Sequence, residues 1–142
     1  MSYQSSESLH RDPEATQFHS ELHTLINAFG DAVISVDRDG RFVLWNPGAE
    51  RLFGYSATEA LGESLDLIIP PQSRKAHWEG FYKAMRLNQT RLGSDLIHVP
   101  MLRKDQTQFP GALTVGVVRE ENNRIVNIGA IIREDTIRNY DQ

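Results

Sequence analysis

The stretch DAVISVDRDGRFVLWN, residues 31–46, decides the fold of this chain. It holds two short runs rich in β-branched and aromatic residues, 32–36 and 41–45, on either side of the polar turn DRDG. Aspartate and glycine in a short turn between two such runs favour a tight reversal of the chain. The stretch therefore predicts a β-hairpin, and the rest of the chain is interpreted around it.

Helical signals follow the hairpin. Asn46 precedes a proline and can cap the amino end of a short helix over 47–53, which Gly54 can end. Two further short helical segments are predicted within 57–68, and a longer helix over about 72–88. The middle of the domain is therefore predicted to be helical.

The last third of the chain is β-rich again. Runs at about 92–103, 108–119 and 125–133 are joined by the turn-like segments KDQT and EENN. Strands and helices in separate blocks indicate an α+β domain with an antiparallel sheet of five strands. The domain is expected to span residues 31–136, followed by a tail at 137–142.

An amphipathic helix is predicted ahead of the hairpin, over residues 14–30, with Gly30 at its end. Apolar side chains recur there on one helical face, whereas the opposite face is polar. This apolar stripe consists of Phe18, Leu22, Leu25, Ile26 and Phe29. Residues 1–13 are polar and are interpreted as a flexible arm. Because the stripe precedes the core elements, it needs a partner surface of its own.

Composition excludes several classes of function. The chain has 142 residues, a net charge of −4 and no cysteine. The negative charge offers no attraction to nucleic acid, and the scattered basic residues argue against binding to a membrane surface. No apolar run approaches the roughly 20 residues of a membrane span, and the polar start is not a signal peptide. A cytoplasmic protein without disulfides, thiolate metal sites or thiol nucleophiles is expected.

Catalytic motifs are missing from the sequence. It contains no G-x-S-x-G elbow, no phosphate-binding glycine loop and no H-E-x-x-H. We therefore expect that the chain is not an enzyme. His19 and His23 lie four residues apart, but no third ligand lies nearby, so the sequence predicts no metal set there.

Three stretches of the chain resemble PAS domains, the sensory modules of many bacterial kinases and transcription regulators. The first, residues 31–70, contains the hairpin followed by W-N-x-x-A-E-x-L-F-G-Y, and the others are RKDQTQFP and IGAIIREDT. The resemblance implies a five-stranded antiparallel sheet with helices on one face and a ligand pocket between them. It also implies that the amphipathic helix packs on the outer face of the sheet, often as part of a homodimer.

In function, the resemblance implies a sensor for signal transduction or transcriptional regulation. A small-molecule or gas ligand in the pocket would alter contacts with an effector domain or partner protein. The alternative is a cofactor-free PAS domain that serves as a dimerisation or docking surface. The lack of cysteine excludes the covalent flavin and photoactive yellow types. A non-covalent flavin, stacked on Trp45 or Trp78, stays open, as does no cofactor at all.

Haem b is the cofactor for which the resemblance supplies a ligand. Oxygen-sensing haem PAS kinases carry R-x-x-H on the helix before the third strand, and residues 74–77 have this pattern, with His77 as the implied iron ligand. Strand alternation over 108–119 places a set of residues on one face, where they would line the haem, with a glycine that leaves room for a flat ligand. These residues are Phe109, Gly111, Leu113 and Val115.

The third strand departs from those sensors. Ile97 stands where they use an arginine to bond bound oxygen, so oxygen selectivity of that kind is not expected. Met101 shares the strand parity of Ile97 and is a candidate sixth iron ligand, as in haem PAS regulators that pair histidine with methionine. His98 has the opposite parity and is expected to be exposed. The ordinary alternatives are a hydrogen-bonded His77, a core-filling Met101 and tryptophans that only pack.

Overall fold

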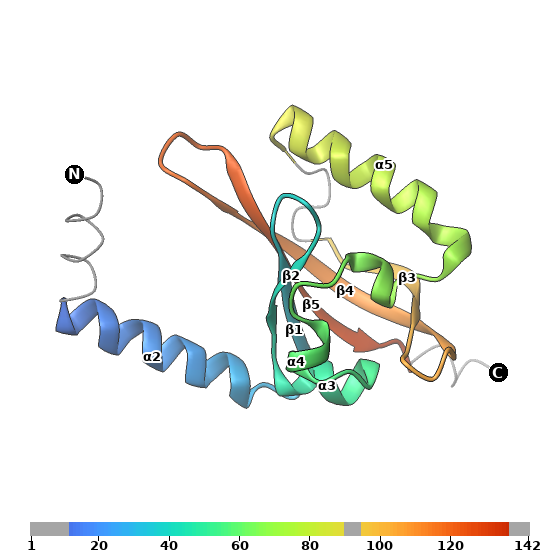
Figure 1. Cartoon of the computed structure of the whole chain (residues 1–142), viewed down its shortest axis with the longest axis horizontal. Helices are drawn as coiled ribbons and strands as arrows, with labels where there is room; N and C mark the ends of the chain where they lie inside the picture. Colours follow the sequence, from blue (N-terminus) through green and yellow to red (C-terminus); the bar gives the residue numbers. More distant parts are fainter. Residues whose placement is uncertain (1–11, 90–94, 137–142) are drawn as a thin grey trace.

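The computed structural model describes residues 12–89 and 95–136 and confirms the predicted α+β fold with one five-stranded antiparallel sheet (Figure 1). The strand order is β2-β1-β5-β4-β3. The strands are β1 Ala32–Val36, β2 Phe42–Trp45, β3 Ile97–Leu102, β4 Gln108–Arg119 and β5 Ile125–Glu134. The helices are α2 Pro13–Ala28, α3 Pro47–Phe53, α4 Ala57–Ala60, the 3-10 helix η1 Leu65–Ile68 and α5 Pro71–Leu87.

Three sequence-based expectations fall outside the described residues. They are residues 1–11 of the predicted arm at 1–13, the first residues of the 92–103 run, and the tail at 137–142. The last two residues of the predicted arm, Asp12 and Pro13, instead form the N-cap and the first residue of α2. Within the described ranges, no helix is long and apolar enough to cross a membrane.

The hairpin forms where its turn chemistry predicted it. Strands β1 and β2 pair antiparallel, with Ile34 opposite Trp45. The Asp37 carboxylate accepts hydrogen bonds from the backbone N–H groups of Asp39 and Arg41, at 2.9 and 3.1 Å. Gly40 takes a positive φ of 76°, a conformation that costs glycine little. The turn therefore sets the register of the first two strands from local sequence.

Asn46 joins three elements at the end of the hairpin and is 1% exposed. Its side-chain oxygen accepts hydrogen bonds from the N–H groups of Val33, at 2.8 Å, and Ala49, at 2.9 Å. Its side-chain nitrogen donates to the carbonyls of Ile26, at 3.0 Å, and Asp31, at 3.1 Å. The predicted N-cap is therefore confirmed, and the same side chain also ties β1 to the carboxyl end of α2.

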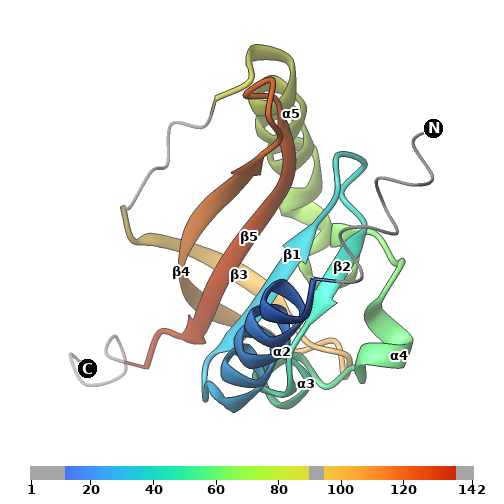
Figure 2. The ribbon, with the colours of Figure 1, turned by 90° about the vertical axis from the view of Figure 1, so that its left-hand side faces the viewer.

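One hydrophobic core fills the space between the sheet and a layer of helices. Its aromatic centre packs Trp45 against Phe42 and Phe53, with ring centroids 4.9 and 5.5 Å apart. The same cluster includes buried residues of α3, α4, η1 and α5 together with inward-facing strand residues. These helices therefore cover one face of the sheet, as expected (Figure 2).

The amphipathic helix α2 differs from its prediction in two ways. It contains no buried residue and extends away from the body of the domain, so the expectation that it packs on the outer sheet face is wrong for this single chain (Figures 1 and 2). It also ends at Ala28 and not at Gly30, because Phe29 takes an extended backbone conformation and redirects the chain. Asp12 caps its first turn through two backbone N–H groups.

Candidate functional site

The face of α5 that meets the sheet carries three residues at four-residue spacing. Phe81 and Met85 are the buried residues of this helix, 7% and 8% exposed, and both belong to the core. His77 lies one helical turn before Phe81, on the same face, because residues i and i+4 lie above one another on a helix. The imidazole therefore lies on the sheet-facing side of α5.

The His77 ring is half-buried among aromatic side chains. It stacks on Phe81 with centroids 6.0 Å apart and meets Trp78 edge to face at 5.0 Å. Its Nδ1 atom is buried without a hydrogen-bond partner among the described residues. Burial lowers the pKa of His77 below its ordinary value of 6.5, while the Asp66 carboxylate acts in the opposite direction. The imidazole is therefore neutral at pH 7, which is the form that binds a metal.

Trp78 fastens α5 to the hairpin. Its indole N–H donates to the Asp66 carboxylate at 2.7 Å, and its ring packs so closely on Gly40 that a Cβ there would lie 2.3 Å from it. The indole also stacks on Tyr82, with ring centroids 5.5 Å apart. These contacts give Trp78 a packing role. Trp45, the other tryptophan considered for a flavin, is 5% exposed and donates its N–H to the Tyr55 carbonyl.

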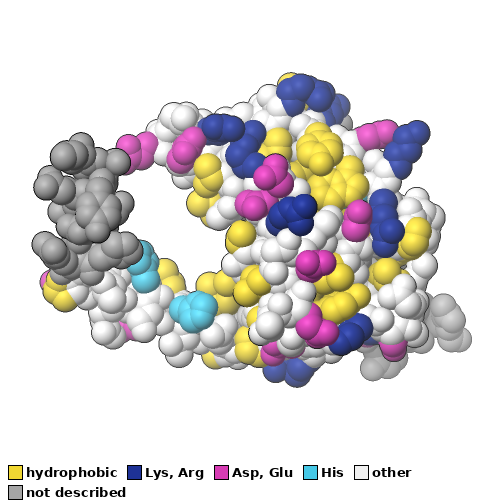
Figure 3. Space-filling model, in the orientation of Figure 1, with side chains coloured by type: hydrophobic (Ala, Val, Ile, Leu, Met, Phe, Trp, Pro, Cys, Tyr) yellow, Lys and Arg dark blue, Asp and Glu magenta, His cyan; other side chains and the backbone are white. Residues whose placement is uncertain are grey.

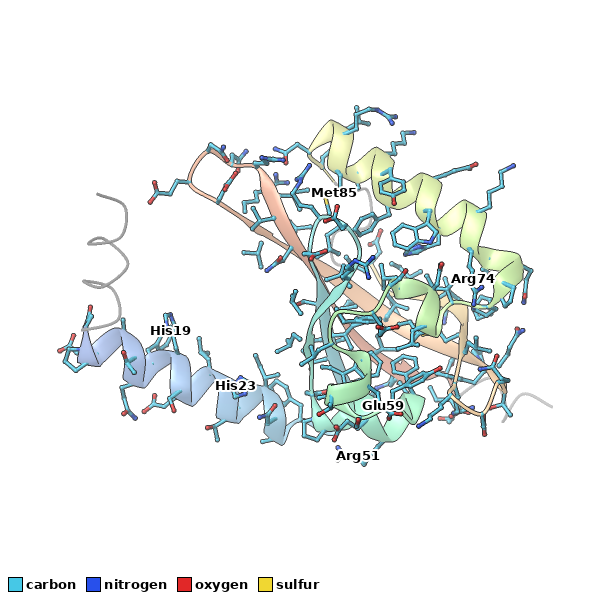
Figure 4. The ribbon with its side chains drawn as sticks, viewed as in Figure 1. His19, His23, Arg51, Glu59, Arg74 and Met85 are labelled. Atoms are coloured by element: carbon cyan, nitrogen blue, oxygen red, sulfur yellow. The ribbon has the colours of Figure 1, made fainter. Side chains whose placement is uncertain are left out.

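Helix α5 is fixed at both ends by polar contacts. Near its start, the Arg74 guanidinium donates to the carbonyls of Ile69 and Asp66, at 3.0 and 3.2 Å (Figure 4). At its end, the Asn88 side chain accepts from the Ile125 N–H at 2.7 Å and donates to the Asn123 carbonyl at 2.8 Å. His77, Phe81 and Met85 lie between these two attachments.

The opposing strands present the inward-facing residues that alternation predicted. The register pairs Ile97 with Leu113, Val99 with Gly111, and Met101 with Phe109, so each pair shares a face. Val115 follows on the same side, paired with Ala130 of β5. All of these side chains are apolar. Phe109 and Met101 are buried, whereas Ile97, Leu113 and Val115 are half-buried, so this part of the inner face is less completely covered.

The space above Gly111 is filled by Met101. A Cβ on Gly111 would lie 2.6 Å from the Met101 sulfur and 2.7 Å from its Cγ. The expectation that Gly111 leaves room for a flat ligand therefore needs correction, because the methionine side chain of the neighbouring strand lies there. In this arrangement the sulfur is part of the core packing.

Two open hollows lie away from His77. One, of about 400 Å³, is lined by β3 and β4 residues that include His98, Pro100 and Pro110. The other, of about 260 Å³, lies around Gly48 and Arg51 at the start of the hairpin. Neither contains His77 in its lining.

The structure also contains a pair that sequence reasoning did not find. His98 is exposed, as its strand parity predicted, and its Nδ1 lies 2.9 Å from the carboxylate of Asp135, which is 6% exposed. The two residues are 37 positions apart, so only the pairing of β3, β4 and β5 brings them together. Among the described residues, no group of three His, Cys, Asp or Glu side chains is arranged to hold a metal.

Comparison with known proteins agrees with this architecture. The family described as PAS fold matches residues 20–134. The chain is 30% identical to the Sensor protein FixL of Bradyrhizobium diazoefficiens over 101 residues, which are 68% of this chain and 19% of that protein. It is 35% identical to the Oxygen sensor protein DosP of Escherichia coli over 46 residues, 32% of this chain and 6% of that protein.

A solved structure shows the same fold. The crystal structure of a PAS domain from Colwellia psychrerythraea superimposes with a TM-score of 0.73 at 22% identity, covering 84% of this chain and 98% of that one. At this identity the likeness concerns the fold alone. The chain spans less than a fifth of the length of the two curated relatives, so their other segments have no counterpart in the match.

Proposed function

The chain belongs to the PAS family, and from this premise we propose that it is a sensor domain that binds haem b through His77. The observation that carries the proposal is the buried Nδ1 atom of His77, which has no hydrogen-bond partner among the described residues. An unsatisfied buried polar atom costs about 1–3 kcal/mol. A bond from this Nδ1 atom to a metal would offset that cost.

The surrounding side chains are chemically suited to haem, although the group would need Met101 to leave the space that it fills above Gly111. The imidazole is neutral at pH 7, and the strands opposite α5 supply an apolar wall that includes Ile97, Leu113 and Val115. A haem bound there would supply an iron that binds a gas or changes redox state. Met101 reaches the same inner face and is the proposed sixth ligand, provided that its sulfur leaves the space above Gly111.

Relatives also support the proposal. The Sensor protein FixL and the Oxygen sensor protein DosP carry sensing in their names, and they match 101 and 46 residues of this chain. We propose the same role here, with a gas or another small molecule as the stimulus and an effector domain or partner protein as the recipient of the signal. We further propose that this domain is not itself catalytic.

Absorption spectroscopy tests the haem proposal. Purified protein is titrated with haemin, and a Soret band at one equivalent is expected, which His77→Ala removes. The matched control is His98→Ala, which removes an exposed histidine outside the inner face and should keep the band. Met101→Leu is expected to convert a six-coordinate spectrum into a five-coordinate one. An unchanged Soret band in His77→Ala would overturn the assignment.

A cofactor-free interaction module is the second candidate. It is favoured by the Met101 side chain, which fills the space above Gly111, and by the uncovered stripe on α2. A protein that stays colourless after haemin addition supports this candidate. A flavin spectrum in the protein as purified would instead support a non-covalent flavin.

A further inference from the structure

Helix α2 carries two histidines that the sensor proposal does not use. His19 and His23 lie one helical turn apart, and both are exposed. Figure 4 labels both side chains, and Figure 3, in the same orientation, shows histidine surface along the upper edge of this helix. Among the described residues, neither imidazole has a hydrogen-bond partner.

The spacing of the two rings suits one metal ion. Side chains at i and i+4 of a helix have Cβ atoms about 5–6 Å apart, which lets two imidazoles reach one ion at about 2.0–2.1 Å. Imidazole nitrogen is a preferred ligand of zinc, copper and nickel. Two histidines supply half of a tetrahedral coordination shell, so within one chain the site is incomplete.

The same helix presents an apolar face that this chain does not cover. Phe18, Leu22 and Leu25 are 58%, 40% and 52% exposed. His19 and His23 each follow a stripe residue by one position, which places them about 100° round the helix, at one edge of the stripe. A second helix packed on the stripe would therefore lie beside the two imidazoles.

We propose that α2 pairs antiparallel with α2 of a second copy of this chain, and that one divalent transition-metal ion joins the two histidine pairs. A two-fold axis across an antiparallel helix pair brings the same edge of both helices to the same side. Each copy then contributes His19 and His23, and the four nitrogens complete the tetrahedral shell that one chain leaves half empty. Packing of the two stripes brings the two histidine pairs together, and the shared metal ion in turn holds the two helices in contact.

Zinc titration of metal-free protein tests the bridge. Protein treated with EDTA and then freed of the chelator is titrated with Zn²⁺ by calorimetry, while sedimentation follows its mass. One zinc per two chains is expected, together with a shift from monomer to dimer. Removal of the zinc with EDTA should return the dimer to monomer. One zinc per chain, or binding without a change of mass, would overturn the proposal.

A spacing variant gives the sharpest control. His23→Gln removes one ligand and should weaken zinc binding by at least about tenfold. The double variant His23→Thr with Thr24→His keeps the composition but separates the rings by five residues, and it should lose the bridge as well. His98→Gln, at an exposed histidine elsewhere, should bind zinc like the parent. Equal zinc binding by the spacing variant and the parent would refute the i, i+4 site.

Discussion

The two halves of the inner sheet face are packed differently. Around β1, β2 and α3 the core residues Ile34, Phe42 and Phe53 are 4%, 1% and 0% exposed. Under α5, Met101 and Phe109 are buried as well, but Leu113 and Val115 are only half-buried. The difference teaches that the first half is packed more completely than the second, so the proposed haem site lies in the half whose inner face is less covered.

The largest expected effect comes from Asn46, whose side chain bonds to α2, β1 and α3. Asn46→Ala would leave four buried or half-buried backbone groups without their side-chain partner, two N–H groups and two carbonyls. The free energy of unfolding should fall by about 3 kcal/mol or more in urea denaturation. Asn122→Ala, whose side chain accepts one exposed turn hydrogen bond, is the control and should change it by less than about 0.5 kcal/mol. Equal effects at both positions would contradict the conclusion that the Asn46 side chain holds these elements together.

Truncation along one row of the sheet compares the two halves directly. Ile34 pairs with Ala130 on β5, and Ala130 pairs in turn with Val115, so the three share a face. Ile34→Ala should cost about 2–4 kcal/mol, because it opens a cavity in a closed core. Val115→Ala should cost less than half of that, because its surroundings are half-exposed and offer fewer contacts to lose. Equal costs in the same urea series would show that both halves are packed alike.

The smallest effect concerns the titration of His77. Its folded-state pKa is lowered by burial, so the unfolded chain binds a proton more readily than the folded one. Protonation of His77 therefore does not lower the free energy of unfolding above pH 6.5, the ordinary pKa of the unfolded chain. Below pH 6.5 the free energy of unfolding falls, until the pH has passed the lowered pKa of the folded state. Urea midpoints between about pH 5 and pH 8 should show this slope. His77→Leu should flatten it, and an unchanged slope in that variant would assign it to other groups.

The proposed sensor and the proposed metal bridge use different ends of the molecule. His77 lies on the sheet-facing side of α5. His19 and His23 lie on the projecting helix α2 (Figure 4). Asn46 bonds to the Ile26 carbonyl near the end of α2 and to β1. Asn46 therefore makes a direct polar contact between the sheet and the helix that would carry the second copy.

The fold was predictable because its signals are local. The turn after β1, the capping role of Asn46 and the left-handed Gly54 at the end of α3 each depend on neighbours within a few residues. Strand alternation likewise placed Ile97, Met101 and Leu113 on one face, because side chains on a strand point alternately to its two sides. The candidate site residues were therefore found on the correct face.

Contacts between distant segments decided the rest. The sequence determined the elements, the hairpin and the amphipathic stripe, since these depend on short-range backbone preferences and on the period of apolar residues. The tertiary structure decided that α2 leaves the body, that Met101 fills the space above Gly111, and that His77 lacks a hydrogen-bond partner. Each of these depends on which side chains from distant segments occupy the same volume, and no local pattern specifies that.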